Sequence, residues 1–598
     1  MAAIMTIKLM KTVGRKNACL AAAALLGLGT AARGAEPQPA TGASVDETLV
    51  QEVLHVSPSG DDANPGTEAA PLGSFTTAMQ RALEHKSQGV GVKVLLHDGI
   101  YRESIGGDES GITGMSPEPD TDAPLVIEAV NPGRAILSGS EIRTGWTQDG
   151  EVWSADWPHR MGAGEHFQGP RMRPVAFERH LVFVDGAMLR QVMSRNALRP
   201  GTFFIDEEET NSVYVHPSAP TDLNEANVET AVRQKLLFLH SIRNVVVRGL
   251  VFEHDNQPYG RLSLARGGWG APLFFRDAQN ILIEDCLIRN NSSVGLQLRA
   301  ARDVTIRNTT IAWSGRIGMG ASDGSVNILV EDSAITRSNF RGHWGNYIDG
   351  WYAAGFKYMN TRRTTFRRVH IHDNWSTGFW WDIDNTDILV EDCLSIRNHV
   401  RGIFIELNQG PTLVRNSVFA LTSQTDRANE GFQGGVQIAT SPDVTFENCL
   451  IFGNEGRQIN FWDQVNRFEG ESIRNFETRQ ALELPPKTQL TLRNNYIAST
   501  GSGQLLYESV SAWGDRIRPL VDLVEFTETT GSRYAHPNRG AAFSLQRRTA
   551  PVSLAAWQQA TGADGDARWV QPLNIDLDAL LEEGVSEQKI RQLIESAR

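Results

Sequence analysis

Short runs of β-branched and aromatic residues recur along the middle of the chain, and each run ends in a charged residue that is usually followed by Asp or Asn. Examples are Ile281-Leu282-Ile283-Glu284-Asp285, Val304-Thr305-Ile306-Arg307-Asn308, Leu389-Val390-Glu391-Asp392 and Leu413-Val414-Arg415-Asn416. The last apolar residues of successive runs, at positions 283, 306, 330, 366, 390 and 414, are separated by 23, 24, 36, 24 and 24 residues. A period near two dozen residues with β-type runs is typical of a solenoid.

The pattern favours one kind of solenoid. Leucine-rich repeats have a similar period, but their L-x-x-L-x-L pattern is missing here. We therefore predict an all-β fold: a right-handed parallel β-helix solenoid with an inserted small β-sandwich and helical caps. Each turn of the coil should add one strand to each of three sheets. The Asp or Asn at the repeated corner suits a turn with left-handed backbone angles.

Changes in the pattern predict the domain boundaries. Residues 50–140 should form an N-terminal cap and the first turns, with an amphipathic helix that Ser74 opens. Residues 141–235 lose the period and alternate in hydrophobicity, which predicts the inserted β-sandwich. The main β-helix should span 236–500. Residues 501–598 should form a last turn and a capping segment that becomes helical from about Leu554.

Composition and charge narrow the possible partners. The 598 residues are 40% hydrophobic and 21% charged, with a net charge of −13, an ordinary composition for a globular protein. An acidic chain gains nothing from the release of phosphate counterions, so we expect no nucleic-acid partner.

The N-terminus indicates the compartment. Residues 1–35 combine basic side chains, an apolar run at 18–28 and small residues at 32–35, the pattern of a signal peptide. This run is too short for a membrane anchor. We therefore expect an exported protein, periplasmic or extracellular.

Three cysteines remain after the predicted signal peptide: Cys286, Cys393 and Cys449. Each follows the end of its apolar run by three residues, so the repeat places all three in one column. Even the nearer pair would lie two turns apart, about 9–10 Å. That separation is too large for a disulfide, so they are predicted to be buried thiols.

One strand in each turn carries the candidate catalytic groups. Two of these strands read Gly378-Phe-Trp-Trp-Asp-Ile-Asp and Gly402-Ile-Phe-Ile-Glu-Leu-Asn. If the apolar positions one and three after each glycine face the core, Trp381 points inward, and Asp382 and Glu406 point outward to solvent. The two acids are 24 residues apart, one turn, so their carboxyl groups should lie roughly 5 Å from each other.

Like charges side by side on neighbouring strands are destabilising unless a proton, a metal or a substrate relieves them. A shared proton divides such a pair into an acid and a nucleophile. A separation near 5 Å is that of a retaining glycosidase, whereas an inverting enzyme needs more room for a water molecule. Asp384, predicted to be diagonal to Glu406, is the alternative partner for an inverting mechanism.

Further residues are candidates for substrate binding. Lys357 and Arg299 could contact the substrate or screen the carboxylates, and Trp344 and Trp351 could form a sugar platform or pack a loop. The full predicted set is Asp384, Lys357, Trp380, Asn408, Arg299, Gln437, Trp344 and Trp351. We find no zinc spacing, phosphate loop or dinucleotide fingerprint. No cofactor is predicted, although Ca²⁺ is possible.

The segments GFWWDIDN at 378–385 and GIFIELNQGPTLVRNSVF at 402–419 resemble the active-site turns of β-helix glycoside hydrolases. The β-xylosidases of family 120 are the nearest group, and the related family 141, with fucosidase and xylanase activities, is the second. The resemblance implies that Asp382 is the nucleophile and Glu406 the acid/base. The chain departs from the xylosidase pattern at Ile383-Asp384-Asn385 and Asn408-Gln409, so the sugar stays open.

Three functions follow from these patterns. The first is an exported glycoside hydrolase that cleaves plant or algal polysaccharides or oligosaccharides by a retaining mechanism. The second is a polysaccharide lyase in which Lys357 or Arg299 removes a proton, while Asp382, Asp384 and Glu406 hold Ca²⁺. The third is a solenoid that binds glycans without catalysis.

Overall fold

The computed structural model describes residues 36–106, 114–161, 179–257, 270–343, 353–423, 434–464, 474–478, 480–482, 487–511 and 518–597. The predicted signal peptide and the candidate residues Trp344 and Trp351 therefore lie outside the described residues. All described residues belong to one structural unit, Glu36–Arg598.

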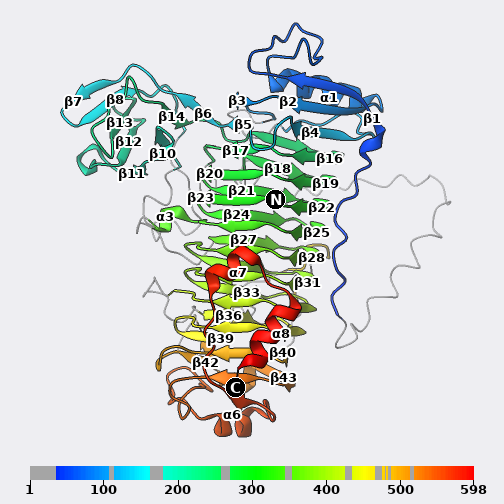
Figure 1. The fold of residues 1–598 in the computed structure, drawn as a ribbon, viewed down its shortest axis with the longest axis vertical. Helices are drawn as coiled ribbons and strands as arrows, with labels where there is room; N and C mark the ends of the chain where they lie inside the picture. Colours follow the sequence, from blue (N-terminus) through cyan, green and yellow to red (C-terminus); the bar gives the residue numbers. More distant parts are fainter. Residues whose placement is uncertain are drawn as a thin grey trace, which may run out of the picture. The chain divides into compact units, whose positions relative to one another are not determined.

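Three long parallel sheets dominate the described residues, with 13, 10 and 13 strands (Figure 1). Sheet 1 consists of β1 (Val50–Val56), β2 (Gly91–Leu96), β4 (Leu125–Ala129), β16 (Arg243–Arg248), β19 (Gln279–Glu284), β22 (Arg302–Arg307), β25 (Val326–Glu331), β28 (Arg362–Arg367), β31 (Thr386–Glu391), β34 (Thr412–Arg415), β37 (Val444–Glu447), β40 (Thr488–Arg493) and β43 (Val524–Thr530). Sheet 2 consists of β15 (Leu237–His240), β18 (Leu273–Arg276), β21 (Val294–Arg299), β24 (Ile317–Ser322), β27 (Ala354–Met359), β30 (Thr377–Asp382), β33 (Arg401–Glu406), β36 (Gly434–Ala439), β39 (Arg457–Asp463) and β42 (Leu505–Ser511). Sheet 3 consists of β3 (Gly99–Tyr101), β5 (Ala135–Ser138), β17 (Val251–Glu253), β20 (Leu287–Asn291), β23 (Thr310–Ser314), β26 (Ala334–Thr336), β29 (His370–His372), β32 (Leu394–Ile396), β35 (Val418–Ala420), β38 (Leu450–Phe452), β41 (Tyr496–Ala498), β44 (Arg533–Ala535) and β45 (Arg568–Trp569).

Along β18 to β42 the chain visits sheets 2, 1 and 3 in turn, so this part of the molecule is the predicted parallel β-helix. The apolar ends of the repeated runs are paired across sheet 1: Ile283, Ile306, Val330, Phe366, Val390, Val414 and Phe446 follow one another strand by strand. These side chains fill the core. The predicted register is confirmed.

The corner residues after sheet 1 adopt the predicted left-handed conformation. Asp285, Asn308, Asp332, Asp392, Asn416, Asn448 and Asn494 have φ between +46° and +56°. Asx side chains tolerate this region because they can bond to nearby backbone. The repeated Asp or Asn therefore suits this turn, although Arg368 adopts the same angle, φ of 52°, at the corner after β28.

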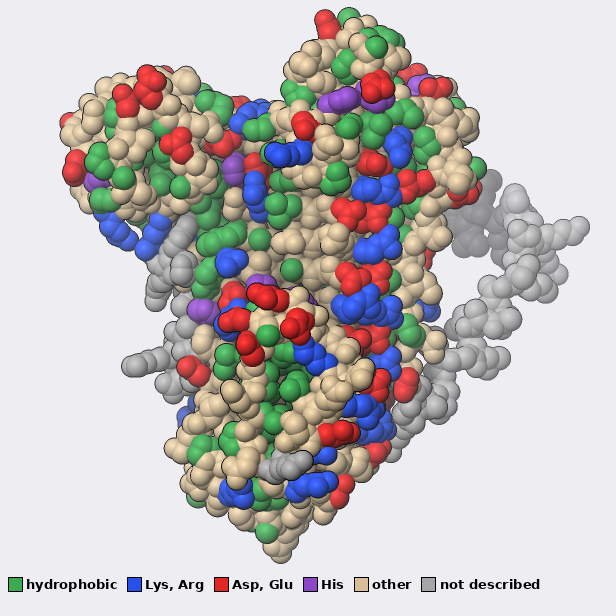
Figure 2. Space-filling model, in the orientation of Figure 1, with side chains coloured by type: hydrophobic (Ala, Val, Ile, Leu, Met, Phe, Trp, Pro, Cys, Tyr) green, Lys and Arg blue, Asp and Glu red, His purple; other side chains and the backbone are tan. Residues whose placement is uncertain are grey.

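The charged residue of each repeat forms a column on the outer face of sheet 1. In strand order the column reads Glu128, Arg248, Glu284, Arg307, Glu331, Arg367, Glu391, Arg415, Glu447 and Arg493, with no two like charges adjacent. Basic and acidic side chains alternate along a stripe in Figure 2. Although burial acts to raise it, hydrogen bonds from Arg415 and Arg367 hold the pKa of Glu391 below its usual value. The alternation therefore stabilises one register of stacking.

The N-terminal end of the core is closed by α1 (Phe75–Ser87). Ser74 accepts a hydrogen bond from the backbone N–H of Thr77, which caps the helix. Phe75, Ala78, Met79, Ala82 and Leu83 form the buried face of this helix.

Between β5 and β15 the chain forms two small sheets of a different kind. One has the order β10 (Ala187–Met188), β9 (Val182–Val184), β14 (Val228–Ala231), β6 (Ser140–Ile142); the other has the order β11 (Arg190–Gln191), β12 (Thr202–Asp206), β13 (Ser212–His216), β8 (Val152–Asp156), β7 (Thr147–Asp149). All but one of their pairings are antiparallel. Val182 and Val228 of the first sheet share a core with Trp153 and Phe203 of the second, so the two sheets pack face to face.

The C-terminal helices have two different roles. α6 (Leu554–Thr561) begins where helical structure is predicted, and its Trp557 packs on Tyr507 and Phe543 at the end of the core. In contrast, α7 (Leu577–Glu583) and α8 (Glu587–Ser596) bury Leu580, Ile590 and Ile594 in an apolar cluster with β32, β35, β38 and β41 of sheet 3. These two helices cover a side of the coil rather than its end. The remaining short helices among the described residues are η1 (Glu47–Leu49), η4 (Arg195–Ala197), α3 (Phe340–His343) and α5 (Leu520–Leu523).

Cys286, Cys393 and Cys449 are buried free thiols, as predicted. Burial raises the pKa of Cys286 and of Cys449 to about 12. They are therefore unreactive core residues.

None of the helices in the described part of the chain combines the length and the hydrophobicity that a bilayer crossing requires.

Candidate active site

Asp382 and Glu406 end two neighbouring strands of sheet 2, β30 and β33, and are paired in the parallel register. Adjacent strands lie about 4.8 Å apart, so one acid lies directly beside the other. Trp381 and Ile405, the residues before them, point into the core, where Trp381 packs among Phe356, Phe366 and Phe379. The two acids therefore lie on the outer face of the coil, as predicted.

The prediction that both carboxylates face open solvent is wrong. Only 5% of Asp382 and 2% of Glu406 is exposed. Both side chains point away from the core of the coil, yet other parts of the protein cover them. Charges and hydrogen bonds act more strongly in such an environment than in water.

Lys357 on β27 neutralises Asp382. Its Nζ lies 2.8 Å from Oδ2 of Asp382 and 3.4 Å from the centre of the Trp380 ring. The ammonium is therefore held by an ion pair and a cation–π contact together. The other oxygen, Oδ1 of Asp382, is buried and has no hydrogen-bond partner among the described residues. Asp382 thus has one oxygen that is bound and one that is available.

Both oxygens of Glu406 accept hydrogen bonds from neutral donors. Nε1 of Trp380 donates to Oε2 over 2.9 Å, and Nε2 of Gln464 donates to Oε1 over 2.6 Å. Trp380 consequently contacts both halves of the site: its ring supports Lys357 and its N–H holds Glu406. These contacts fix the orientation of the Glu406 carboxyl group.

Gln464 is absent from the predicted site. It directly follows β39, two strands beyond Glu406 in sheet 2 and 58 residues away in the chain. The residue opposite Glu406 on the intervening strand β36 is Ala439. Its single methyl group leaves room for the Gln464 side chain. A small residue such as Ala439, paired with an acid on the neighbouring strand, is the sequence signal that could have indicated a contact from the strand beyond it.

An aromatic row lies beside the acids on the outer face of sheet 2. Ring centroids are 5.5 Å apart for Trp380 and Phe404 and 5.7 Å for Phe404 and Trp462. The guanidinium of Arg401 lies 4.5 Å from the Phe404 centroid. The rings pack against one another, and only 2% of Trp380 and 1% of Phe404 is exposed.

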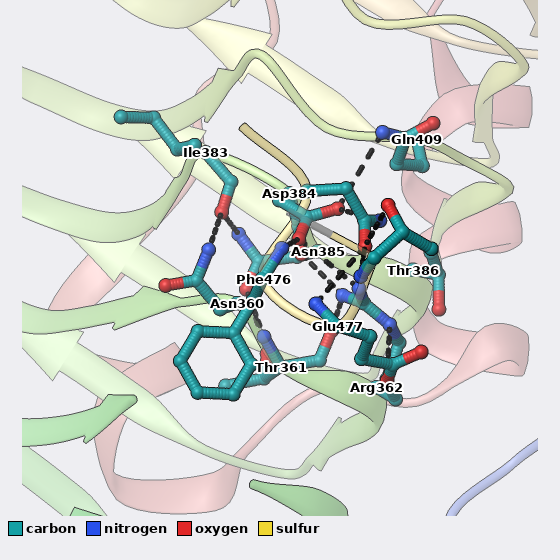
Figure 3. Close-up of polar contacts among 12 residues, drawn as sticks. Asn360, Thr361, Arg362, Ile383, Asp384, Asn385, Thr386, Gln409, Phe476 and Glu477 are labelled. Carbon is teal, nitrogen blue, oxygen red and sulfur yellow. Dashed lines mark hydrogen bonds and ion pairs between the residues drawn. The ribbon is translucent and has the colours of Figure 1, made fainter. Parts of the chain in front are cut away.

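Asp384 does not belong to this face, contrary to the prediction. Ile383 and Asp384 have φ of 50° and 60°, so strand alternation stops immediately after Asp382. The Asp384 carboxylate is fully buried and accepts hydrogen bonds from Arg362, Asn475 and the backbone N–H of Phe476 (Figure 3). It ties the turn to residues 474–478 and is not available as a second acid for an inverting mechanism.

Asn408 is also misplaced by the prediction. Leu407 has φ of 55°, which turns Asn408 inward. Its Oδ1 accepts a hydrogen bond of 2.7 Å from Nδ2 of Asn385, and its Nδ2 donates to the Trp381 carbonyl. Asn408 thus belongs to a buried ladder of polar side chains that joins successive turns, not to a substrate site.

Gln437 lies on the outer face of sheet 2, paired with Phe404, and is described further below. Arg299 lies on the same face, but three strands before Asp382. Its guanidinium forms an ion pair with Asp323. At about 4.8 Å per strand it is roughly 14 Å away, so it does not contact the acid pair.

The three carboxylates that a calcium-binding lyase site would need do not come together, because Asp384 is turned into its own network. In the described part of the chain no group of three or more His, Cys, Asp or Glu side chains is arranged to hold a metal ion.

Comparisons with known proteins agree with the fold. Residues 271–431 match the family model "Right handed beta helix region". No curated protein matches the chain.

Three solved structures illustrate the range of similar folds. The complex of XylC with xylose is 15% identical, covers 76% of this chain and 86% of its own, and has a TM-score of 0.53. A structure described as a glycoside hydrolase is 13% identical, with coverages of 86% and 99% and a TM-score of 0.44. The A-module of the Azotobacter vinelandii mannuronan C-5 epimerase AlgE6 is 11% identical, with coverages of 83% and 96% and a TM-score of 0.46. At 15% identity, the likeness to the XylC complex is one of fold.

Proposed function

We propose that the protein is an exported glycoside hydrolase that cleaves plant or algal polysaccharides or oligosaccharides with retention of anomeric configuration. The observation that carries the proposal is the enclosed pair of Asp382 and Glu406 in direct register on neighbouring strands. Among the described residues, the ammonium of Lys357 contacts Asp382, whereas Trp380 and Gln464 donate hydrogen bonds to Glu406. Two carboxyl groups with unlike surroundings are the arrangement that divides a pair into nucleophile and acid.

The first step uses Asp382 as the nucleophile. Lys357 forms an ion pair with Asp382, which we assign as the nucleophile. We assign the proton of the pair to Glu406, because two like charges side by side on neighbouring strands are unfavourable. Oδ1 of Asp382, which lacks a partner among the described residues, forms a bond to the anomeric carbon. As the glycosidic bond breaks, the Glu406 proton passes to the leaving oxygen.

The second step releases the sugar. Glu406, now ionised, takes a proton from a water molecule, and the water oxygen forms a bond to the anomeric carbon. The bond to Asp382 breaks and its electron pair returns to the carboxylate, where the Lys357 ammonium stabilises it. The proton is again on Glu406, so the cycle closes with retained configuration.

Two further observations support a saccharide substrate and export. The β-helix that has a TM-score of 0.53 to this chain was solved with xylose. The N-terminal 35 residues have the pattern of a signal peptide. Because the acids are largely covered, binding of a sugar requires movement of the groups around them.

A panel of nitrophenyl glycosides tests the proposal. Wild-type protein should hydrolyse at least one of them, and Asp382→Ala and Glu406→Gln should each lower kcat at least about 1,000-fold. Arg299→Gln, remote from the pair, is the control and should retain activity. Full activity in either acid variant would refute the assignment. An unsaturated product absorbing in the ultraviolet would indicate a lyase instead.

A further inference from the structure

Gln437 on β36 presents a hydrogen-bond donor that nothing in the described part of the chain accepts. The side chain is fully buried. Its Oε1 accepts a hydrogen bond from Nε of Arg401, so the two ends of the amide are assigned by chemistry: the oxygen faces the guanidinium and the NH₂ group faces away. Nε2 has no acceptor among the described residues. A buried donor without a partner is costly, and ligand sites are one reason for such a cost.

The position of Gln437 relates it to the acid pair. It is paired with Phe404 on the neighbouring strand, two residues before Glu406. Strand spacing and rise place its Cα about 8 Å from that of Glu406 on the same outer face. The residue directly opposite Glu406 is Ala439, so no long side chain of β36 separates the Glu406 carboxyl group from the Gln437 amide.

The order of the strands indicates on which side of the acid pair the leaving group would lie. Lys357, Asp382, Glu406 and Gln437 lie on β27, β30, β33 and β36, which are consecutive in sheet 2. The nucleophile bonds to the sugar that stays, and the acid protonates the oxygen that leaves. The leaving group therefore lies on the Glu406 side of the scissile bond, toward Gln437.

We propose that Nε2 of Gln437 donates a hydrogen bond to a hydroxyl of the sugar that leaves, and so selects saccharides over simpler alcohols in this position. This inference rests on the proposed function, because the leaving-group side is defined by Glu406 acting as the acid. The ligand class is a pyranose or furanose unit with a free hydroxyl, joined to the sugar that Asp382 attacks.

The test compares two substrates of one sugar: the nitrophenyl glycoside that the wild-type protein cleaves fastest, and the disaccharide of that sugar. Gln437→Glu keeps an oxygen for Arg401 but replaces the donor with an acceptor. We expect kcat/KM for the disaccharide to fall about 10-fold or more, and that for the nitrophenyl glycoside to change less than about 3-fold. Gln437→Met, which is uncharged, should show the same split.

Gln297→Glu is the matched control, because Gln297 occupies the same outward column on β21 but its Nε2 already donates to the Leu298 carbonyl. Gln297→Glu should not lower kcat/KM for the disaccharide more than kcat/KM for the nitrophenyl glycoside. Equal losses on both substrates in the Gln437 variants, or no loss on either, would overturn the inference.

A glycan array separates this inference from the proposed function. Wild-type and Gln437→Glu proteins are applied to monosaccharides and oligosaccharides. Oligosaccharide signals that need Gln437, in a protein without hydrolytic activity, would support the Gln437 contact and refute the hydrolase. Hydrolysis with oligosaccharide signals unaffected by the substitution would refute the Gln437 contact alone. Absence of any glycan signal together with absence of hydrolysis would contradict both.

Discussion

The ammonium of Lys357 lies 2.8 Å from one oxygen of Asp382, while the other oxygen of that carboxylate has no partner among the described residues. In the proposed mechanism the two oxygens have separate tasks, one for charge stabilisation and one for attack. The ion pair is almost completely enclosed, since 3% of Lys357 and 5% of Asp382 is exposed. Removing one partner of an enclosed pair leaves an uncompensated charge.

Lys357→Met should therefore lower kcat/KM about 100-fold, because it leaves the enclosed Asp382 carboxylate without its partner charge. Steady-state kinetics on the preferred nitrophenyl glycoside would show the loss. Lys357→Arg, which retains the charge, should recover part of the activity. An unchanged kcat/KM in Lys357→Met would contradict the role.

Trp380→Phe should shift the alkaline limb of the pH–rate profile. The substitution removes the N–H that donates to Oε2 of Glu406 but keeps a ring beneath Lys357. A lost donor destabilises the carboxylate form, so the acid should stay protonated to higher pH and the alkaline limb should move upward. Trp462→Phe is the comparison, because that indole does not donate to Glu406. If the pH–rate profiles of the wild-type and Trp380→Phe proteins have the same alkaline limb, the hydrogen bond from Trp380 does not influence Glu406.

The stability of the fold should depend on pH through Asp255. This side chain is fully buried, and burial raises its pKa to about 8, although Ser292 donates to it and Arg341 and Arg179 act in the opposite direction. An unfolded Asp titrates near 3.9. Between about pH 4 and pH 8 the folded state thus keeps a proton that the unfolded state releases, and the free energy of unfolding falls as pH rises, by at most ~1.4 kcal/mol per pH unit.

Asp255→Asn removes this proton linkage. Urea unfolding at pH 5, 6.5 and 8 should show that the variant loses less stability than the wild type as pH rises. Parallel pH dependences of the two proteins would mean that Asp255 is ionised in the folded state.

The alternating charges on the outer face of sheet 1 predict that reversing one charge destabilises the protein more than removing it. Arg367 lies between Glu331 and Glu391, with its Nε 2.5 Å from Oε1 of Glu391. Arg367→Glu would align three acids and should destabilise the protein by about 1–3 kcal/mol, with partial recovery in high salt. Arg367→Met, which only removes the pair, should cost less. Equal urea midpoints for the two variants would show that repulsion between strands is unimportant.

The register of the fold could be predicted from the sequence because every turn of the coil repeats the same physical demands. The apolar end of each run must fill the core, and the next polar residue must adopt a left-handed angle. A column defined by Ile283, Val390 and Phe446 therefore also places the cysteines that follow, and it aligns Asp382 with Glu406.

Departures from the repeat could not be predicted in the same way. Alternation along a strand holds only while the backbone stays extended, and it ends at Ile383 and Leu407, which misplaced Asp384 and Asn408. Gln464 reaches Glu406 across Ala439, a contact between turns that differ in length. No periodic pattern encodes the enclosure of the acids, of which only 5% of Asp382 and 2% of Glu406 is exposed.

Trapping of the covalent intermediate tests the central claim most directly. Protein incubated with an activated 2-deoxy-2-fluoro glycoside of its preferred sugar would be digested and the labelled peptide sequenced by mass spectrometry. The account predicts one sugar per chain, bonded to Asp382, and no label in Asp382→Ala. A label on any other residue, or hydrolysis with inverted configuration and no label at all, would contradict it.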